Sequence, residues 1–176
     1  VLGVDRNPEM LALSRQAAPV VAEAIGYSNV RFLEGAIEAL DEQHDGAGPL
    51  VPDASIDVVL SNCVLNLVNP TARQRLLANI RRVLAPGGRV AISDIVCDRP
   101  VPMHLQRDPE LWSGCISGAW QEDDFLEDFR RHGLEQVSLA ERSEQPWRTL
   151  EGIEVRAVTL VAQLPGQPSE VGAPCC

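Results

Sequence analysis

The segment 81-RRVLAPGGRVAISDIV-96 joins the end of an amphipathic helix, a Pro-Gly-Gly turn and an apolar strand in direct succession. The helix is expected over residues 71–84 and should stop at the turn, because glycine and proline commonly terminate helices. Its arginines lie mostly opposite an apolar side formed by Leu76, Leu77, Ile80, Val83 and Leu84. Residues 89–96 are apolar apart from Ser93 and Asp94, which predicts a strand within a parallel sheet.

Strand and helix patterns alternate on both sides of this segment. Further strands are expected at residues 1–4, 30–33, 56–60, 134–139 and 154–161, and further helices at residues 8–26 and 121–132. Asn7 is a suitable N-cap for the first helix, whose rough apolar face includes Met10, Leu13 and Val21. Residues 56–60 should form a buried strand. The order predicts an α/β protein with a mostly parallel sheet and an antiparallel addition at its end.

Composition excludes several classes of protein. The chain has 176 residues, 45% of them hydrophobic, which fits one soluble domain. No apolar stretch reaches the roughly 18 residues of a membrane-spanning helix, and no secretory signal pattern is present. The formal charge of -10 argues against a partner such as nucleic acid or an anionic membrane. We therefore expect a cytoplasmic protein, and a monomer, whose five cysteines are free thiols.

Two residues at strand ends are candidates for a binding site. Ligands of open α/β sheets lie beyond the carboxyl ends of the strands, and Asp5 occupies such a position. Its carboxylate suits the two hydroxyls of a ribose, or it simply supports the turn that follows. Cys63, within 61-SNCVLNLV-68, is either a ligand or an inert, buried small side chain. The residues themselves leave both alternatives open.

Four blocks in the same order resemble the class I S-adenosylmethionine-dependent methyltransferases. The blocks are 1-VLGVDRNPEM-10, 30-VRFLEGAIEAL-40, 56-IDVVLSNCVLNL-67 and 81-RRVLAPGGRVAISDIV-96. The resemblance implies S-adenosylmethionine as the cofactor and a Rossmann-like sheet. It also implies that Asp5 binds the adenosyl ribose. Ile37 and Glu38 would border the adenine, and Asn62 would lie beside the methionine part.

The family's first strand and its glycine-rich loop are not found in this sequence. In that fold the first strand lies near the middle of the sheet, so its absence would leave backbone groups of neighbouring strands unpaired. We therefore expect a Rossmann-like class I sheet that lacks this strand and loop. We also expect the chain to be marginally stable and inactive by itself, even though its parent would be an active enzyme.

Two further segments resemble one group within this family, the arsenite methyltransferases. They are 61-SNCVLNLV-68 and 111-LWSGCISGA-119, and each presents one cysteine beside small or polar residues. The resemblance implies that Cys63 and Cys115 hold trivalent arsenic, a soft centre that thiolates bind well. The function implied is arsenite methylation, and with it arsenic detoxification. A third cysteine of that family has no counterpart here, so weaker arsenic binding is expected.

The other cysteines receive lesser roles. Cys97 follows a strand, and we expect it to be structural. Cys175 and Cys176 end the chain and could capture arsenic and pass it on, or could do nothing. We expect residues 1–100 to form the cofactor-binding core and residues 101–164 the substrate-side segment with the late strands of the same domain. Residues 165–176 would be a flexible tail.

The resemblance also implies a reductant. Each methyl transfer leaves pentavalent arsenic, so thiols must return electrons, and thioredoxin or glutathione would supply them. Two alternatives remain. One is a methyltransferase that acts on a carbon or oxygen of a small metabolite, with Cys63 incidental. The other is a non-enzymatic module that binds arsenite through its thiols.

Overall fold

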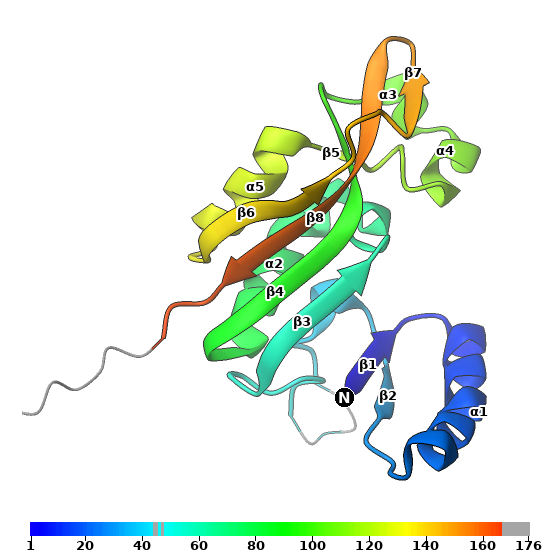
Figure 1. Ribbon diagram of the computed structural model, residues 1–176, viewed down its shortest axis with the longest axis vertical. Coiled ribbons are helices and arrows are strands. Elements are labelled where there is room, and N and C mark those ends of the chain that lie inside the picture. The colour runs from blue at the N-terminus through cyan, green and yellow to red at the C-terminus, as the bar shows by residue number, and fades with distance from the viewer. Residues whose placement is uncertain (44–45, 47, 167–176) are drawn as a thin grey trace, which may run out of the picture.

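The computed structural model describes residues 1–166 except 44, 45 and 47, and its largest part is a six-stranded sheet (Figure 1). The sheet has the strand order β3–β4–β8–β6, with β5 paired to β4 and β7 paired to β8. Its strands are β3 (Ile56–Asn62), β4 (Leu84–Cys97), β5 (Trp120–Gln121), β6 (Glu135–Arg142), β7 (Arg148–Leu150) and β8 (Ile153–Gln163). Strands β3, β4 and β5 run parallel, whereas β8 is antiparallel to β4, β6 and β7. The mostly parallel sheet with an antiparallel addition is thus confirmed.

A second, two-stranded sheet lies apart from the first. It consists of β1 (Leu2–Asp5) and β2 (Arg31–Glu34), which pair in parallel and are joined by α1 (Pro8–Ile25). Figure 1 shows this unit to one side of the main sheet, next to β3. Within the described residues, β1 pairs with β2 and β3 pairs with β4, and no strand bridges β1 to β3. This agrees with the expectation of unpaired strand edges.

Helices α2 (Arg73–Val83) and α5 (Glu122–Arg131) cover one face of the main sheet (Figure 1). Their apolar sides form the main core with β4 and β8, and its largest fully buried side chains include Leu76, Leu77, Ile92, Phe125, Phe129 and Leu160. A smaller cluster lies under α4 (Pro109–Ser113) and contains Cys97 and Cys115. A third cluster, built on Leu40, Leu50, Val51 and Val83, attaches the β1–β2 sheet to the rest.

Short helical turns complete the structure between these elements. They are the 3-10 helices η1 (Ile37–Ala39), η2 (Leu65–Leu67) and η3 (Pro70–Ala72), and the α-helix α3 (Met103–Gln106). Among the helices that the structure describes, none has both the length and the apolar character needed to cross a bilayer. Two of these turns, η1 and η2, follow strands and position the residues of the candidate site.

The local signals of the sequence are largely confirmed, with small shifts. Asn7 caps α1, because its side chain accepts hydrogen bonds from the backbone N–H groups of Glu9 and Met10. Helix α2 ends at Val83, before the Pro-Gly-Gly turn, because Leu84 already has extended backbone angles and begins β4. The turn itself belongs to the start of this long strand.

One expectation about burial is wrong, and one apolar face is more exposed than its pattern suggests. The strand at residues 56–60 is not buried: Leu60 is 74% exposed and Val58 is 39% exposed, because β3 is the last strand of its sheet and α2 covers one face only. The apolar face of α1 is also open, with Leu13 58% exposed and Val21 55% exposed. This helix packs on a sheet of two strands, which offers too little surface to cover it.

Candidate functional site

The first cysteine of the site lies where β3 ends. Strand β3 continues to Asn62, two residues beyond the predicted end, so Cys63 is the first residue after the strand. The Cys63 N–H donates to the carbonyl of Ser93 at 2.9 Å, which holds the chain against β4. The backbone then turns sharply, and Cys63 adopts a φ of 55°, an uncommon angle for a residue other than glycine. Its side chain is left exposed to solvent.

The second cysteine reaches the same place from a distant part of the chain. Cys115 lies in the loop after α4, where its N–H donates to the Trp112 carbonyl and its φ is 64°. The Cys115 thiol donates to the carbonyl of Cys63, with an Sγ···O distance of 3.4 Å. Cys115 is 9% exposed, whereas Cys63 is open to solvent. The two cysteines therefore lie next to each other, with Cys115 buried and Cys63 exposed to solvent.

Desolvation and a nearby carboxylate raise the pKa of both thiols above the ordinary value. Desolvation raises the pKa of the Cys63 thiol, and the negative charge of Asp94 raises it further. The pKa of Cys115 is raised by the same two causes and by the proximity of Cys63. A centre that binds both as thiolates must therefore displace their protons.

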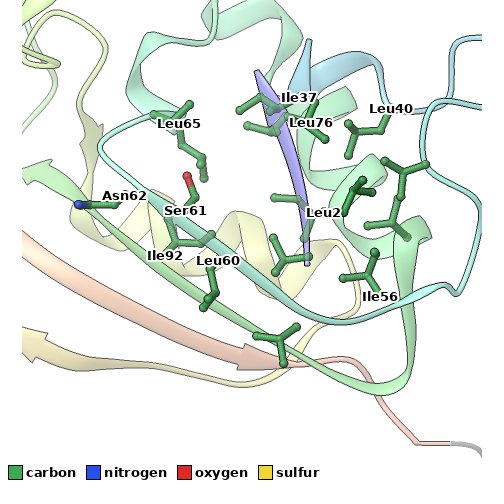
Figure 2. A pocket seen from close by; sticks show the side chains of 17 residues that line it. Leu2, Ile37, Leu40, Ile56, Leu60, Ser61, Asn62, Leu65, Leu76 and Ile92 are labelled. Carbon is green, nitrogen blue, oxygen red and sulfur yellow. The ribbon is translucent and has the colours of Figure 1, made fainter. Parts of the chain in front are cut away.

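Asn62 connects the cysteines to an apolar cavity. Its Oδ1 accepts a hydrogen bond from the Cys63 thiol at 3.4 Å. Asn62 also lines a cavity of about 330 Å³ between β1 and β3, together with Ile37 of η1. Figure 2 shows Leu2 of β1 on one side of this cavity and Leu60 and Asn62 of β3 on the other. Asn62 thus adjoins both Cys63 and the cavity that Ile37 also lines.

Asp5 and Glu38 lie outside the set of residues that line this cavity. Asp5 ends β1, and its Oδ1 accepts the N–H of Asn7 at 2.8 Å, so the carboxylate does support the turn into α1. Glu38 is half-buried in η1, and its Oε1 is 3.9 Å from a guanidinium nitrogen of Arg6. The ion pair joins the residue after β1 to η1, which follows β2, so Asp5 and Glu38 lie near the same end of the small sheet.

Cys97 shares the buried cluster under α4 with Cys115, but its thiol hydrogen-bonds to neither cysteine of the pair. Its thiol is buried and donates to the Trp120 carbonyl at 3.1 Å. The structural role of Cys97 stays a prediction. Cys175 and Cys176 lie outside the described residues. Within the described part of the chain, no group of three or more His, Cys, Asp or Glu side chains could hold a metal ion.

The buried thiol of Cys97 should make the fold sensitive to alkaline pH. Burial raises its pKa from 9.0 to about 11, so the folded state keeps a proton that the unfolded state loses. The stabilisation is fully present below pH 9.0 and is lost as the pH rises toward 11, by on the order of 2 kcal/mol. Urea unfolding across this range measures the effect, and Cys97→Ser should remove it. An identical pH dependence in the two proteins would contradict the assignment.

Sequence analysis missed Asn66 and left two alternatives open for Asp94, lining the cleft or capping the next turn. Asn66 and Asp94 are both buried, and the amide of Asn66 donates to the Asp94 carboxylate at 2.8 Å. Desolvation raises the pKa of Asp94, although backbone N–H groups of residues 64–66 and 95 oppose the shift. The one signal in the sequence was that Asp94 is the only charged residue in 90-VAISDIV-96.

Comparison with known proteins identifies the family. Residues 1–133 match the methyltransferase domain family, a region that contains both cysteines of the pair and every other described site residue. The chain belongs to this family. In this methyltransferase domain, Asp5 ends β1 and Asn62 ends β3.

The methyltransferase domain is similar to arsenite methyltransferases in particular. It is 41% identical over 145 residues to the arsenite methyltransferase of Halobacterium salinarum, which is 82% of this chain and 33% of that protein. For the enzyme of Aquipseudomonas alcaligenes the identity is 38%, over 80% of this chain and 38% of that protein. The chain thus spans about a third of the length of the first relative and a little more than a third of the second.

A solved structure shows the same similarity in three dimensions. An arsenic(III) S-adenosylmethionine methyltransferase from Chlamydomonas reinhardtii superimposes with a TM-score of 0.76 and is 33% identical. The superposition covers 96% of this chain and 56% of that one. The methyltransferase fold is therefore shared along nearly the whole of the chain, including the late strands β6 and β8 beyond residue 133.

Proposed function

We propose that this chain is part of an enzyme that transfers methyl groups from S-adenosylmethionine to trivalent arsenic held by Cys63 and Cys115. The observation that carries the proposal is the contact of the Cys115 thiol with the Cys63 carbonyl, because it brings two distant cysteines together beside Asn62. The similarity to arsenite methyltransferases supports the choice of arsenic over another soft centre.

The thiol pair would bind and orient the arsenic. Thiolates are the soft ligands that trivalent arsenic prefers, and each arsenic–sulfur bond formed displaces one thiol proton. Two bonds leave the arsenic lone pair free as the nucleophile, so no general base is needed for the transfer itself. Fixing the arsenic beside the cofactor site turns an encounter in solution into a step between neighbours.

The cofactor would lie across the corner between the two sheets. Bound S-adenosylmethionine supplies an electrophilic methyl group on a sulfonium sulfur. The fit rests on three features: the Asp5 carboxylate retains lone pairs beyond the one that Asn7 uses, Ile37 offers an apolar wall, and Asn62 presents an exposed amide. Glu38 would border the adenine beside Ile37. In this proposal residues 1–100 hold the cofactor and residues 101–164 bring Cys115 to the substrate.

The ribose role of Asp5 gives a first prediction. Asp5→Asn keeps an oxygen that can accept the Asn7 N–H, yet it removes the charge that would strengthen hydrogen bonds from the ribose hydroxyls. A hydrogen bond to a charged group is worth about 1.5–3 kcal/mol, so S-adenosylmethionine should bind at least roughly 10-fold more weakly. Calorimetry measures the affinity. Asp57→Asn, at the other end of β3, is the control, and equal affinities in all three proteins would contradict the role.

The function itself is tested with the gene product as the cell makes it. Arsenite should be methylated with consumption of S-adenosylmethionine, and Cys63→Ser should abolish that turnover while leaving cofactor binding unchanged. Survival of turnover in Cys63→Ser would favour a methyltransferase that acts on a metabolite carbon or oxygen. Tight arsenite binding without cofactor binding would instead favour a non-enzymatic arsenite-binding module.

The proposal also includes a cellular setting. The arsenic lone pair forms the bond to the methyl group, and arsenic is thereby oxidised from the trivalent to the pentavalent state. Two thiols must return the two electrons and become a disulfide, which thioredoxin or glutathione then reduces. We infer a cytoplasmic monomer that acts in arsenic detoxification, in keeping with the reducing conditions that free thiols require.

A further inference from the structure

Asn66 lies at the centre of the contacts around the cysteine pair. Its side chain is 1% exposed, and its amide nitrogen donates to Asp94 Oδ1 at 2.8 Å and to the Ile95 carbonyl at 2.7 Å. Its backbone N–H is directed at the other oxygen of Asp94, at 3.4 Å. Because both acceptors face the amide nitrogen, the orientation of the amide is fixed. Asn66 is therefore bound to β4 through both its backbone and its side chain.

These contacts hold the Cys63 turn from both sides. Before the turn, Asn62 pairs with Ser93 and the Cys63 N–H donates to the Ser93 carbonyl. After the turn, Asp94 holds Asn66. The left-handed backbone at Cys63 is unfavourable for a residue with a side chain, so it persists only where its surroundings impose it. The two anchors on β4, one residue apart, impose it here.

Asn66 also supports the segment that carries Cys115. A Cβ atom placed on Gly118 would come within 1.9 Å of the Asn66 carbonyl oxygen, so the two backbones are in direct contact. The Gly118 carbonyl accepts a hydrogen bond from Arg73, whose guanidinium lies 3.8 Å above the ring of Trp120. The loop with Cys115 therefore contacts the backbone of Asn66 directly, and Arg73 holds it there.

The contacts of Asn66 and Asp94 include features that lower the stability of the fold. Asn66 Oδ1 is buried and has no hydrogen-bond partner among the residues that the structure describes. A buried acceptor without a donor destabilises the fold, and a buried carboxylate such as Asp94 adds desolvation. Polar groups kept in a core under these conditions commonly serve a site rather than the fold.

We propose that Asn66 and Asp94 are positioning residues that set the separation of the Cys63 and Cys115 thiols. Asp94 fixes the turn that presents Cys63, and Asn66 transmits this position to the Cys115 loop through its contact with Gly118. The consequence for arsenic capture rests on the proposed function, whereas the effect on the thiol separation does not. The experiment therefore needs one measurement with arsenic and one without.

Dibromobimane supplies the measurement without arsenic, because it becomes strongly fluorescent when it links two neighbouring thiols. The full 176-residue chain is used with Cys175→Ser and Cys176→Ser, and buried Cys97 is left in place. The yield of linked product is compared with that of singly alkylated product for Asp94→Asn and Asn66→Ala. The ratio is preferred to the rate, since removing the Asp94 charge alters thiol reactivity. Asn79→Ala is the control, because Asn79 is also buried and hydrogen-bonded but contacts neither cysteine segment.

We expect both site variants to remain folded, with the linked fraction and the affinity for phenylarsine oxide each reduced about 10-fold or more. Asn79→Ala should lower the melting temperature and leave both quantities near those of the parent. The proposal is overturned if the linked fraction is unchanged in a folded site variant, or if Asn79→Ala reduces it equally. If the parent links its thiols but does not bind phenylarsine oxide, the arsenic function fails while the positioning role stands.

Discussion

Cys63→Ser and Cys115→Ser should each weaken the binding of phenylarsine oxide by about 100-fold, because this trivalent arsenical has two positions for thiols. When one thiol has bound, the second acts at a high effective concentration, which typically adds a factor of about 10²–10⁴ to the affinity. The Cys115 thiol already contacts the Cys63 carbonyl, so little reorganisation is needed. Titration by tryptophan fluorescence or calorimetry measures the affinity.

The other cysteines determine the controls for this prediction. The adjacent pair Cys175 and Cys176 could itself chelate the reagent, so both are replaced by serine throughout. Cys97→Ser is the matched control, because its buried thiol with a pKa of about 11 takes no part in the pair. Affinities that stay within a few fold of the parent in Cys63→Ser or Cys115→Ser would disprove chelation by this pair.

Gly118→Ala should destabilise the fold by about 3 kcal/mol, since it forces a methyl group against main-chain atoms. The added carbon would lie 1.9 Å from the Asn66 carbonyl oxygen, and neither backbone can yield without moving the turn or the loop. The same movement separates the cysteines, so phenylarsine oxide affinity should fall together with stability. Urea unfolding and arsenical titration of the same variant measure the two effects.

Gly114→Ala is the matched control, four residues earlier in the same loop. A Cβ atom there meets its nearest neighbour at 3.5 Å, an ordinary contact, and the Gly114 φ of -82° suits any residue. Stability and affinity should change little. Equal losses in Gly114→Ala and Gly118→Ala would show that the loop tolerates no side chain at all, and would remove the special role of the contact with Asn66.

Much of the fold could be predicted because its signals are local. The Asn7 cap and the strand that follows the Pro-Gly-Gly turn depend on neighbouring residues, and the structure confirms both. The exposure of apolar side chains on β3 and α1 could not be predicted in the same way, because it depends on distant elements. An apolar pattern indicates which side chains favour a core, but Leu60 and Leu13 are exposed because few elements cover them.

In the candidate site, too, residues with local signals could be predicted and residues that depend on distant contacts could not. Cys63 stood out because it follows a recognisable strand, whereas the roles of Asn62, Cys63 and Cys115 came from the family resemblance; the structure brings Cys115 beside Cys63. Asn66 was not found, since its importance comes from Asp94 and Gly118, which are 28 and 52 residues away in the sequence. A contact of that kind leaves no periodic or compositional trace.

The division of strands between two sheets has a dynamic consequence. Asp5 belongs to the small sheet and Asn62 to the large one, and the two are joined through the Leu40 cluster rather than by a shared ladder. We therefore expect the small sheet of this chain to open in local unfolding events more readily than the large one. A ligand that contacts both Asp5 and Asn62 would hold the two sheets together. Amide hydrogen exchange in β1 and β2 would then slow as the ligand saturates the protein.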